Sequence, residues 1–419
     1  MSATQTRPAK AGHKGGILRH YWFDFLVTAF AVAGTLYFMG LLSGFQLAIL
    51  IVLEITFSFD NAVVNASILN KMSPLWQLLF MTVGIPIAVV GMRFLFPIII
   101  VMLSANLSFG DVWNLALHEP HTYAEKLEVA HPAIAIFGGV FLLLIFLNFI
   151  LEERKVTWVS WLERPLSRVG KAGKLDVASL FIAILVVWLV AVTASSHEEK
   201  EIFAWGVASI LLYVAVSFAS SFFEDDDDGD DEDDDSTTFT LEDDNTPKKT
   251  GMAAFAAFMY LEVQDAAFSF DGVSGAFAIS DMIILIALGL GIGALFVRSM
   301  TVHLVRSKTL AKYRYLEHGA HYAIGVLALC MIVSIHVNIP DWVTGSIGVV
   351  FIAAAVRASL KANKLAELEA QNKAAAEFTE LPPPTASPET IRALGATALR
   401  GSGVTFSDDE PTGRGGMQN

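Results

Sequence analysis

The stretch LEITFSFDNAVVNA, residues 53–66, places two carboxylate side chains, Glu54 and Asp60, inside a segment that is otherwise mostly apolar. A second stretch, LEVQDAAFSFDGVSGAF at 261–277, repeats the core FSFD, again with acidic residues just upstream. Carboxylates are costly to bury unless they are protonated, paired or bound to a cation. The repetition therefore indicates a site that uses these acids.

The composition of the chain is that of an integral membrane protein. Of its 419 residues, 54% are hydrophobic and 17% are charged, whereas a soluble domain averages about 25% charged residues. The formal net charge of −14 comes from one acidic run at 224–244, without which it would be zero. The single cysteine, Cys330, excludes a disulfide or a cysteine-based metal site within one chain.

Apolar segments long enough to cross about 30 Å of hydrocarbon recur along the chain. The ten expected spans are residues 20–39, 44–69, 75–104, 133–151, 177–194, 202–223, 251–279, 282–304, 317–336 and 341–358. Lys and Arg gather in alternate loops, and the loops between them contain only Lys126 and Lys200. This asymmetry predicts a multi-pass protein of the cell membrane with both termini in the cytoplasm.

The expected organisation follows from these spans and from the polar segments between them. It comprises a cytoplasmic tail at 1–19, a first membrane half at 20–223 that contains a repeat at 44–151, an acidic linker at 224–250, a second half at 251–358 with the other repeat, and a cytoplasmic helix with a disordered tail at 359–419. The acidic linker reads as a self-repelling spacer between the two halves.

The two FSFD motifs begin repeat units of three helices. When the motifs are aligned, Glu54 falls on Asp265 and Asp60 falls on Asp271. The copies start at the second and seventh spans, and an odd separation means that they cross the membrane in opposite directions. The sequence thus predicts an all-α polytopic membrane protein of about ten transmembrane helices with an inverted repeat, an arrangement found in many secondary transporters.

The cost of the intramembrane acids indicates what they do. An ionised carboxylate at the bilayer centre costs about 2.5–3.5 kcal/mol, and the two copies contain five: Glu54, Asp60, Glu262, Asp265 and Asp271. The following spans contribute one arginine each, Arg93 and Arg298, as counter-charges or, alternatively, as interfacial anchors. Two arginines cannot neutralise five acids, so protons and a bound cation are expected to complete the balance. The alternative is that the acids are inert.

The donor set favours a hard divalent cation. Glu54 and Asp60 are six residues apart, so on an intact helix they do not share a face. Either the helix breaks near FSFDN or the two acids face different neighbours, and Asn61 and Gly272 suit a break. The expected ligands are the oxygens of Glu54, Asp60, Asn61, Glu262, Asp265 and Asp271. Such oxygens suit Mn²⁺, Ca²⁺ or Mg²⁺.

The first motif, extended to LEITFSFDNAVVNASIL, resembles the first signature of the TerC family of integral membrane proteins. The acidic insert and the second motif, LEVQDAAFSFDGVSGAFAISD, resemble a related bacterial family of membrane proteins with a domain of unknown function. The wider LysE-type transporters are similar in their three-helix inverted repeats. The resemblance covers roughly 40–360 and implies metal-ion transport, with manganese export as the best-supported role.

Carried onto this chain, the resemblance implies that Glu54, Asp60 and Asn61 of the first motif and Asp265 and Asp271 of the second form the site. The chain departs from the pattern at Gly272, which stands where the first copy has Asn61, and in its additional Glu262.

These observations together predict a transporter that exports a divalent cation, most favourably Mn²⁺, driven by protons that enter the carboxylates. The expected partners are the cation, protons and the lipid bilayer, with no nucleic acid. No nucleophile–base pairing or histidine-rich metal motif is present, so an enzyme is not expected. The rival hypothesis is a non-transporting TerC-like membrane factor, for metal stress or complex assembly, that uses the acidic run.

Overall fold

The protein is described from a computed structural model covering residues 21–154, 156–172, 175–194, 199–224, 248–277, 279–307 and 309–379. The tail at 1–19, most of the acidic linker and the end of the chain from residue 380 lie outside these residues. Contacts divide the chain into two compact units, Met1–Arg357 and Ala358–Asn419. In the second unit, residues 358–379 are helical.

The regular elements of the described residues are helices, which confirms the predicted fold class, and the only other pairing among them is an isolated bridge between Met72 and Lys249. The helices are α2 (Trp22–Met39), α3 (Leu41–Phe57), α4 (Phe59–Leu69), α5 (Pro74–Thr82), α6 (Gly84–Pro86), the π-helix η1 (Ile87–Leu95), α7 (Phe96–Ser104), α8 (Phe109–His118), α9 (Pro120–Val129), α10 (His131–Leu151), α11 (Ser160–Ala172), α12 (Leu175–Thr193), α13 (Glu199–Glu224), α14 (Gly251–Phe277), α15 (Ile283–Arg306), α16 (Thr309–Lys312), α17 (Leu316–Ser334) and α18 (Asp341–Thr379).

Each of the ten predicted spans corresponds to a helix or to a run of consecutive helices. Among the described residues, seven helices are long and apolar enough to cross a membrane on their own, or up to eight if the bent pair α3–α4 is one span. They are Trp22–Met39, Pro74–Ser104, His131–Leu151, Glu199–Ala219, Ile283–Arg306, Leu316–Ser334 and Val343–Glu369. The apolar part of α12, Val177–Thr193, is shorter, and α14 carries three acidic residues.

Apolar side chains point outward from the peripheral helices. On α2, Phe30 is 72% exposed and Phe38 is 82% exposed, and on α12 Phe181 is 67% exposed. Exposed apolar surface of this kind is unfavourable in water but suits contact with lipid tails. The polar residues that the sequence singles out lie instead between the central helices.

The first helices of the two repeats run antiparallel. At one end, the residues that follow α4 pair with those that precede α14, because Lys249 donates to the carbonyl of Lys71 over 2.9 Å and accepts from Ser73 over 3.1 Å. At the other end, Gln46 near the start of α3 donates over 2.6 Å to the carbonyl of Ile279, which follows α14. The start of one helix therefore meets the end of the other at both ends of the pair.

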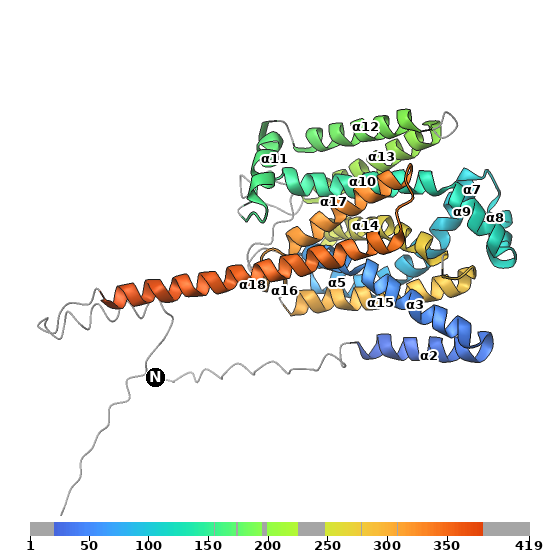
Figure 1. The fold of residues 1–419 in the computed structure, drawn as a ribbon, viewed down its shortest axis with the longest axis horizontal. Helices are drawn as coiled ribbons and strands as arrows, with labels where there is room; N and C mark the ends of the chain where they lie inside the picture. Colours follow the sequence, from blue (N-terminus) through green and yellow to red (C-terminus); the bar gives the residue numbers. More distant parts are fainter. Residues whose placement is uncertain are drawn as a thin grey trace, which may run out of the picture. The chain divides into compact units, whose positions relative to one another are not determined.

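The second and third helices of the repeats pair in the same antiparallel manner (Figure 1). Arg298 of α15 donates over 2.9 Å to the carbonyl of Phe80, whereas a Cβ on Gly291 would lie 2.7 Å from Val89. The residue numbers thus rise on one helix as they fall on the other.

In the third pair, the ring of Phe149 at the end of α10 is 5.3 Å from that of His318 at the start of α17. Farther along the same pair, Gly139 of α10 faces Ile332 of α17.

The packing between helices follows the same inverted symmetry. The bent pair α3–α4 packs on α15, and in the other repeat α14 packs on η1. Likewise, α4 packs on α17, and α14 packs on α10. This exchange is what a two-fold axis in the membrane plane produces, so the contacts support the predicted inverted repeat. The remaining helices pack on its outside, α2 on α3 and α15, and α12 and α13 on α10.

Candidate functional site

The helix that carries the first motif is bent at Ser58. Helices α3 and α4 meet there at 51°, and the Ser58 hydroxyl donates over 2.8 Å to Oε1 of Glu54. Helical hydrogen bonds continue across the bend, from Ser58 to the Glu54 carbonyl and from Ala62 to the Ser58 carbonyl. Of the two alternatives, a broken helix or acids that face different neighbours, the first copy shows a bend at which the helical hydrogen bonds are kept, without an unwound turn. In the second copy α14 runs unbroken past Gly272.

A small internal cavity lies at this bend. Its lining residues are Glu54, Phe57, Ser58, Asp60, Phe268, Gly272, Leu327, Thr344, Gly345, Ile347 and Gly348, which come from α3, α4, α14, α17 and α18 and from Ser58 between α3 and α4. The cavity leaves about 10 Å³ for the centre of a water molecule, which is close to the minimum for one water. In this conformation the site can therefore accommodate one water or one dehydrated ion.

The two oxygens of Glu54 have different surroundings. Oε1 accepts a hydrogen bond from Arg93 Nη2 over 2.5 Å and another from the Ser58 hydroxyl. Oε2 lies on the side of α14, where a Cβ placed on Gly272 would be only 3.1 Å away. Among the described residues Oε2 accepts no hydrogen bond, so it is the oxygen that can turn to a ligand in the cavity.

Asp60 forms the opposite side of the cavity, beneath α18. Its Oδ1 accepts the backbone N–H of Asn61 over 3.0 Å. A Cβ on Gly348 would lie 3.0–3.2 Å from the Asp60 carboxylate, and one on Gly345 would collide with the ring of Phe57. Glycine at these two positions lets α18 approach the bend closely, because any side chain would separate the helices.

Arg93 lies in the π-helix of the third span. It is 3% exposed, and its Nη1 donates over 3.0 Å to the carbonyl of Ala88, five residues earlier. Besides the contact with Glu54, Nη1 lies 3.7 Å from Oδ2 of Asp265. π-Helical segments are rare and often occur at functional sites, and η1 carries the guanidinium that contacts both repeats.

Arg298 of α15 is held by a second set of contacts. Its two terminal nitrogens donate to the two oxygens of Glu262 over 2.9 and 2.8 Å, a bidentate pair. The guanidinium also lies 4.2 Å from the centre of the Phe80 ring. A Cβ on Gly84 would collide with this guanidinium and with the Glu262 carboxylate, so glycine there leaves room for the ion pair.

Asp265 lies between the two arginines. Its Oδ1 accepts from the Asn61 amide over 2.7 Å, and its Oδ2 is 3.5 Å from Arg298 and 3.7 Å from Arg93. In the FSFD alignment, Asp265 is the residue equivalent to Glu54. In the structure, however, the ion pair of the second repeat that corresponds to Glu54–Arg93 is Glu262–Arg298. The physical reason is the bend at Ser58, since one copy is bent between its two acids and the other is continuous.

The structure thus divides the predicted site residues into two neighbouring groups. Glu54 and Asp60 line the cavity, and Glu54 also contacts Arg93, whereas Asn61, Glu262 and Asp265 lie beside the arginines without lining the cavity. The side chain of Asp271 is outside the described ones, although its neighbour Gly272 lines the cavity. No group of three or more His, Cys, Asp or Glu side chains suited to a metal occurs among the side chains that are described.

The sequence reasoning missed the contribution of α18. Thr344, Gly345 and Gly348 line the cavity, yet they belong to the tenth predicted span, outside both repeats. The stretch TGSIG at 344–348, with its small residues at helical spacing, was the available signal. Such stripes also occur wherever helices merely pack closely in membranes, so the pattern alone does not identify a site.

Charged residues also close the end of the bundle where α4 and α10 end and α14 and α17 begin. Arg154 lies 2.8 Å from Glu152 and 3.6 Å from Glu317. Lys71 lies next to the Met72–Lys249 bridge. Burial lowers the pKa of Lys71 to about 8, and this effect outweighs the opposite effect of the nearby Glu317 carboxylate. Burial likewise lowers the pKa of Lys249 to about 8. These contacts tie the two repeats together at that end.

Comparison with known families matches residues 59–366 to the family described as Protein of unknown function (DUF475). The match covers more than half of the 419 residues, and the chain belongs to this family. The matched range includes Asp60, both arginines and the whole of α14 and α15, whereas Glu54 precedes it. Searches of curated proteins and of solved structures each found no match.

Proposed function

We propose that this member of the DUF475 family is a transporter that binds a divalent metal cation in the cavity at Ser58 and moves it out of the cell. The observation that carries the proposal is that Glu54 and Asp60 line one buried cavity between oppositely oriented repeats. Two carboxylates at such a depth are costly without a positive partner. Midplane sites between inverted repeats are typical of secondary transporters.

The donor chemistry supports a hard cation. The cavity offers the carboxylates of Glu54 and Asp60 and the hydroxyls of Ser58 and Thr344. These are oxygen donors, which suit Mn²⁺, Mg²⁺ or Ca²⁺ rather than soft metals. The resemblance of the first motif to TerC proteins favours Mn²⁺ among them.

The contacts of Arg93 indicate how the carboxylates can be neutralised. Arg93 holds Oε1 of Glu54, and it also lies 3.7 Å from Asp265. In the proposed cycle, a cation that binds Glu54 and Asp60 displaces the guanidinium toward Asp265. Arg93 then keeps a carboxylate partner in both states, which avoids leaving a buried charge unpaired.

In the proposed cycle, access to the cavity alternates between the two ends of the inverted repeat. The Arg154–Glu317 ion pair and the backbone hydrogen bond between Lys249 and Lys71 join the repeats at one end, and the Gln46–Ile279 contact joins them at the other. In the proposed cycle these contacts open in turn, while protons that enter the carboxylates release the cation. Coupling to protons predicts that flux depends on a pH gradient.

The test is a flux measurement with purified protein in liposomes. Entry of Mn²⁺, Mg²⁺ or Ca²⁺ is followed with an encapsulated metal-sensitive dye, with and without a pH gradient. Wild type is expected to pass Mn²⁺, Asp60→Asn and Glu54→Gln are expected to abolish the flux, and the exposed Glu128→Gln is the matched control. Wild-type liposomes that pass no divalent cation, or flux that persists in both site variants, would contradict the proposal.

A further inference from the structure

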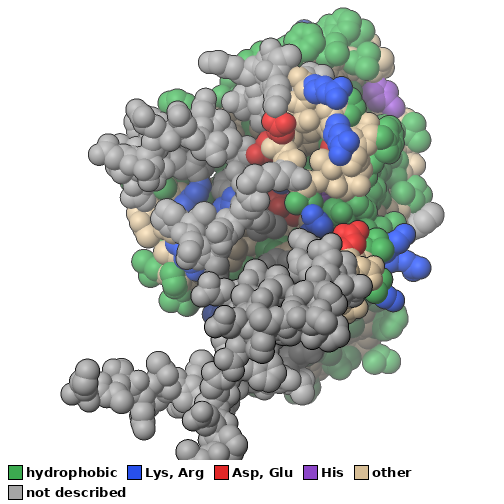
Figure 2. Space-filling model, turned by 90° about the vertical axis from the view of Figure 1, so that its left-hand side faces the viewer, with side chains coloured by type: hydrophobic (Ala, Val, Ile, Leu, Met, Phe, Trp, Pro, Cys, Tyr) green, Lys and Arg blue, Asp and Glu red, His purple; other side chains and the backbone are tan. Residues whose placement is uncertain are grey.

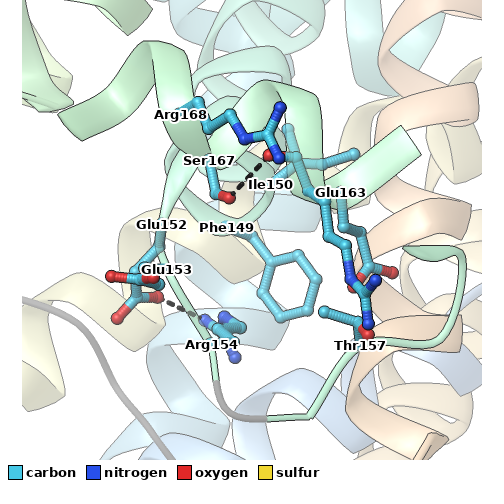
Figure 3. A pocket seen from close by; sticks show the side chains of 10 residues that line it. Phe149, Ile150, Glu152, Glu153, Arg154, Thr157, Glu163, Ser167 and Arg168 are labelled. Atoms are coloured by element: carbon cyan, nitrogen blue, oxygen red, sulfur yellow. Dashed lines mark hydrogen bonds and ion pairs between the residues drawn. The ribbon is translucent and has the colours of Figure 1, made fainter. Parts of the chain in front are cut away.

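A second pocket, separate from the cavity at Ser58, lies between the end of α10, the chain that follows it and α11 (Figure 3). Its volume is about 370 Å³. The lining residues are Phe149, Ile150, Glu152, Glu153, Arg154, Thr157, Glu163, Arg164, Ser167 and Arg168. The lining is therefore rich in charge, and its character depends on which charges are already paired.

Two of the acids that line this pocket already have hydrogen-bond or ion-pair partners. Glu152 pairs with Arg154 over 2.8 Å. Glu163 is buried and accepts from the backbone N–H of Val159 over 2.9 Å and from the hydroxyl of Tyr322 over 2.9 Å. These contacts compensate both carboxylates and one of the three arginines.

The ten lining residues contain three glutamates and three arginines, so their formal charges balance, but two of the arginines are not engaged by these contacts. Arg164 and Arg168 are exposed, and neither has a carboxylate partner among the residues that the structure describes, whereas Glu153 already has an interaction partner. The two arginines are four residues apart on α11 and so lie on one face of the helix. The hydroxyls of Ser167 and Thr157 also line the pocket but already form hydrogen bonds, Ser167 with the carbonyl of Arg164 over 3.1 Å and Thr157 with the hydroxyl of Ser160 over 2.9 Å. Two guanidinium groups on one helix face suit an anion with several oxygens, such as a phosphate group.

The position of α11 places these two arginines at the membrane surface. The helix follows the 21-residue apolar helix α10 and is amphipathic. Leu162 and Leu166 pack toward the core, whereas Trp161 is 79% exposed. Basic amphipathic helices with exposed Trp are typical of the membrane interface.

The face of the molecule at this end agrees with that position, because Lys, Arg, Asp and Glu side chains gather on it beside hydrophobic ones (Figure 2). The Lys and Arg pattern of the loops predicts that it is cytoplasmic, and the cytoplasmic leaflet carries anionic lipids.

We propose that this pocket binds the phosphate group of an anionic lipid headgroup, held by Arg164 and Arg168. Bound lipid fixes α11 against the end of α10, beside the Arg154 pairs that join the repeats. The site is independent of the cation cavity and does not rest on the proposed transport function.

The test measures thermal unfolding of the full-length protein in neutral detergent micelles, with phosphatidylglycerol, phosphatidylcholine or sodium phosphate added. The variants are Arg164→Gln/Arg168→Gln and the charge-conserving Arg164→Lys/Arg168→Lys. Arg306→Gln, an exposed arginine at the end of α15, is the matched control. Mass spectrometry of the intact protein in the same micelles counts the phosphatidylglycerol molecules that remain bound.

Phosphatidylglycerol is expected to raise the midpoint of wild type and of Arg306→Gln more than phosphatidylcholine does. In the Arg164→Gln/Arg168→Gln variant, the apparent affinity is expected to fall about tenfold or more, because charge-assisted hydrogen bonds are lost. The Arg164→Lys/Arg168→Lys variant is expected to retain part of the affinity for phosphatidylglycerol. Equal stabilisation of wild type and the glutamine variant overturns the site. If sodium phosphate stabilises the protein and phosphatidylglycerol adds no further effect, the pocket binds free phosphate, and the proposal of a lipid headgroup is wrong.

Discussion

Arg93 donates to Oε1 of Glu54 over 2.5 Å, while the other oxygen of that carboxylate lies beside the cavity. Nη1 of the same guanidinium is 3.7 Å from Asp265. Arg93 thus stands between a carboxylate of one repeat and a carboxylate of the other. In the proposed cycle, this relationship lets a positive group stay beside the buried carboxylates whether or not a cation is bound, since one positive group replaces the other.

The Glu54–Arg93 pair is expected to show strong coupling in a double-mutant cycle. Glu54→Gln leaves Arg93 with Asp265, at 3.7 Å, as its carboxylate partner, and we expect a loss of about 3 kcal/mol in the free energy of unfolding. Glu54→Gln/Arg93→Met removes both charges and should lose less than the sum of the single variants. Denaturant titrations in detergent measure the four free energies. Additive losses would show that the pair is not coupled.

Filling the cavity from the side of α18 should block the cation without unfolding the protein. In Gly348→Ala the new methyl group meets the Asp60 carboxylate at 3.0–3.2 Å. We expect Mn²⁺ binding to weaken about tenfold, as overpacking costs about 1–3 kcal/mol. Gly34→Ala on α2 is the control, because a Cβ there has no neighbour within 4 Å. Titration calorimetry measures both affinities, and equal values would argue against a cation beside Asp60.

Thr344 is expected to supply a hydroxyl oxygen to the cation. Thr344→Val keeps the shape of the side chain but removes the oxygen, so Mn²⁺ affinity should fall, whereas Thr344→Ser should restore it. The same calorimetric titration distinguishes the variants. If wild type binds Mn²⁺ and Thr344→Val binds it equally well, α18 contributes shape but no ligand. This outcome leaves the carboxylate site intact.

The third span should tolerate a methyl group at one glycine and not at another. In Gly84→Ala the Cβ collides with the Arg298 guanidinium, whereas in Gly91→Ala the nearest neighbour is 3.9 Å away, at Ile87. We expect Gly84→Ala to lower the free energy of unfolding by about 1–3 kcal/mol and Gly91→Ala to leave it nearly unchanged. Thermal unfolding in detergent compares them. A similar loss in both would show that Arg298 can move aside freely.

The lowered pKa values of the two lysines at the Met72–Lys249 bridge predict that the stability of the protein rises with pH. Burial lowers the pKa of Lys71 and of Lys249 to about 8, below the value of about 10.4 in an unfolded chain. Between these values the unfolded state binds more protons, so the free energy of unfolding increases as pH rises from about 8 to 10. Thermal unfolding across this range should show a steeper rise in wild type than in Lys71→Met/Lys249→Met. Parallel curves would contradict the lowered values.

Much of the architecture was predictable because it follows from local sequence. The lengths of the apolar segments identified the membrane helices. The two FSFD motifs, five spans apart, predicted an antiparallel pair of helices, which the backbone hydrogen bond between Lys249 and Lys71 supports. The acids six residues apart raised the possibility of a break, which occurs at Ser58. The arginines of the following spans were interpreted either as counter-charges or as interfacial anchors, and in the structure each contacts carboxylates of the motifs.

The particular pairing of the side chains was not predictable. Equal spacing placed Asp265 opposite Glu54, but only the first copy bends, so Asp265 meets Asn61 and both arginines instead. The approach of Gly348 to Asp60 depends on packing between segments almost 300 residues apart. Contacts of this kind arise from tertiary packing and leave no periodic pattern in a single sequence.

The central claim is that Glu54 and Asp60 bind one divalent cation in the cavity at Ser58. The most direct measurement is a calorimetric titration of Mn²⁺ into detergent-solubilised wild type, Asp60→Asn and Glu128→Gln at pH 7. The account predicts one tight site per chain in wild type and in Glu128→Gln, and loss of that site in Asp60→Asn. A site of unchanged stoichiometry and affinity in Asp60→Asn, or no site in wild type, would contradict it.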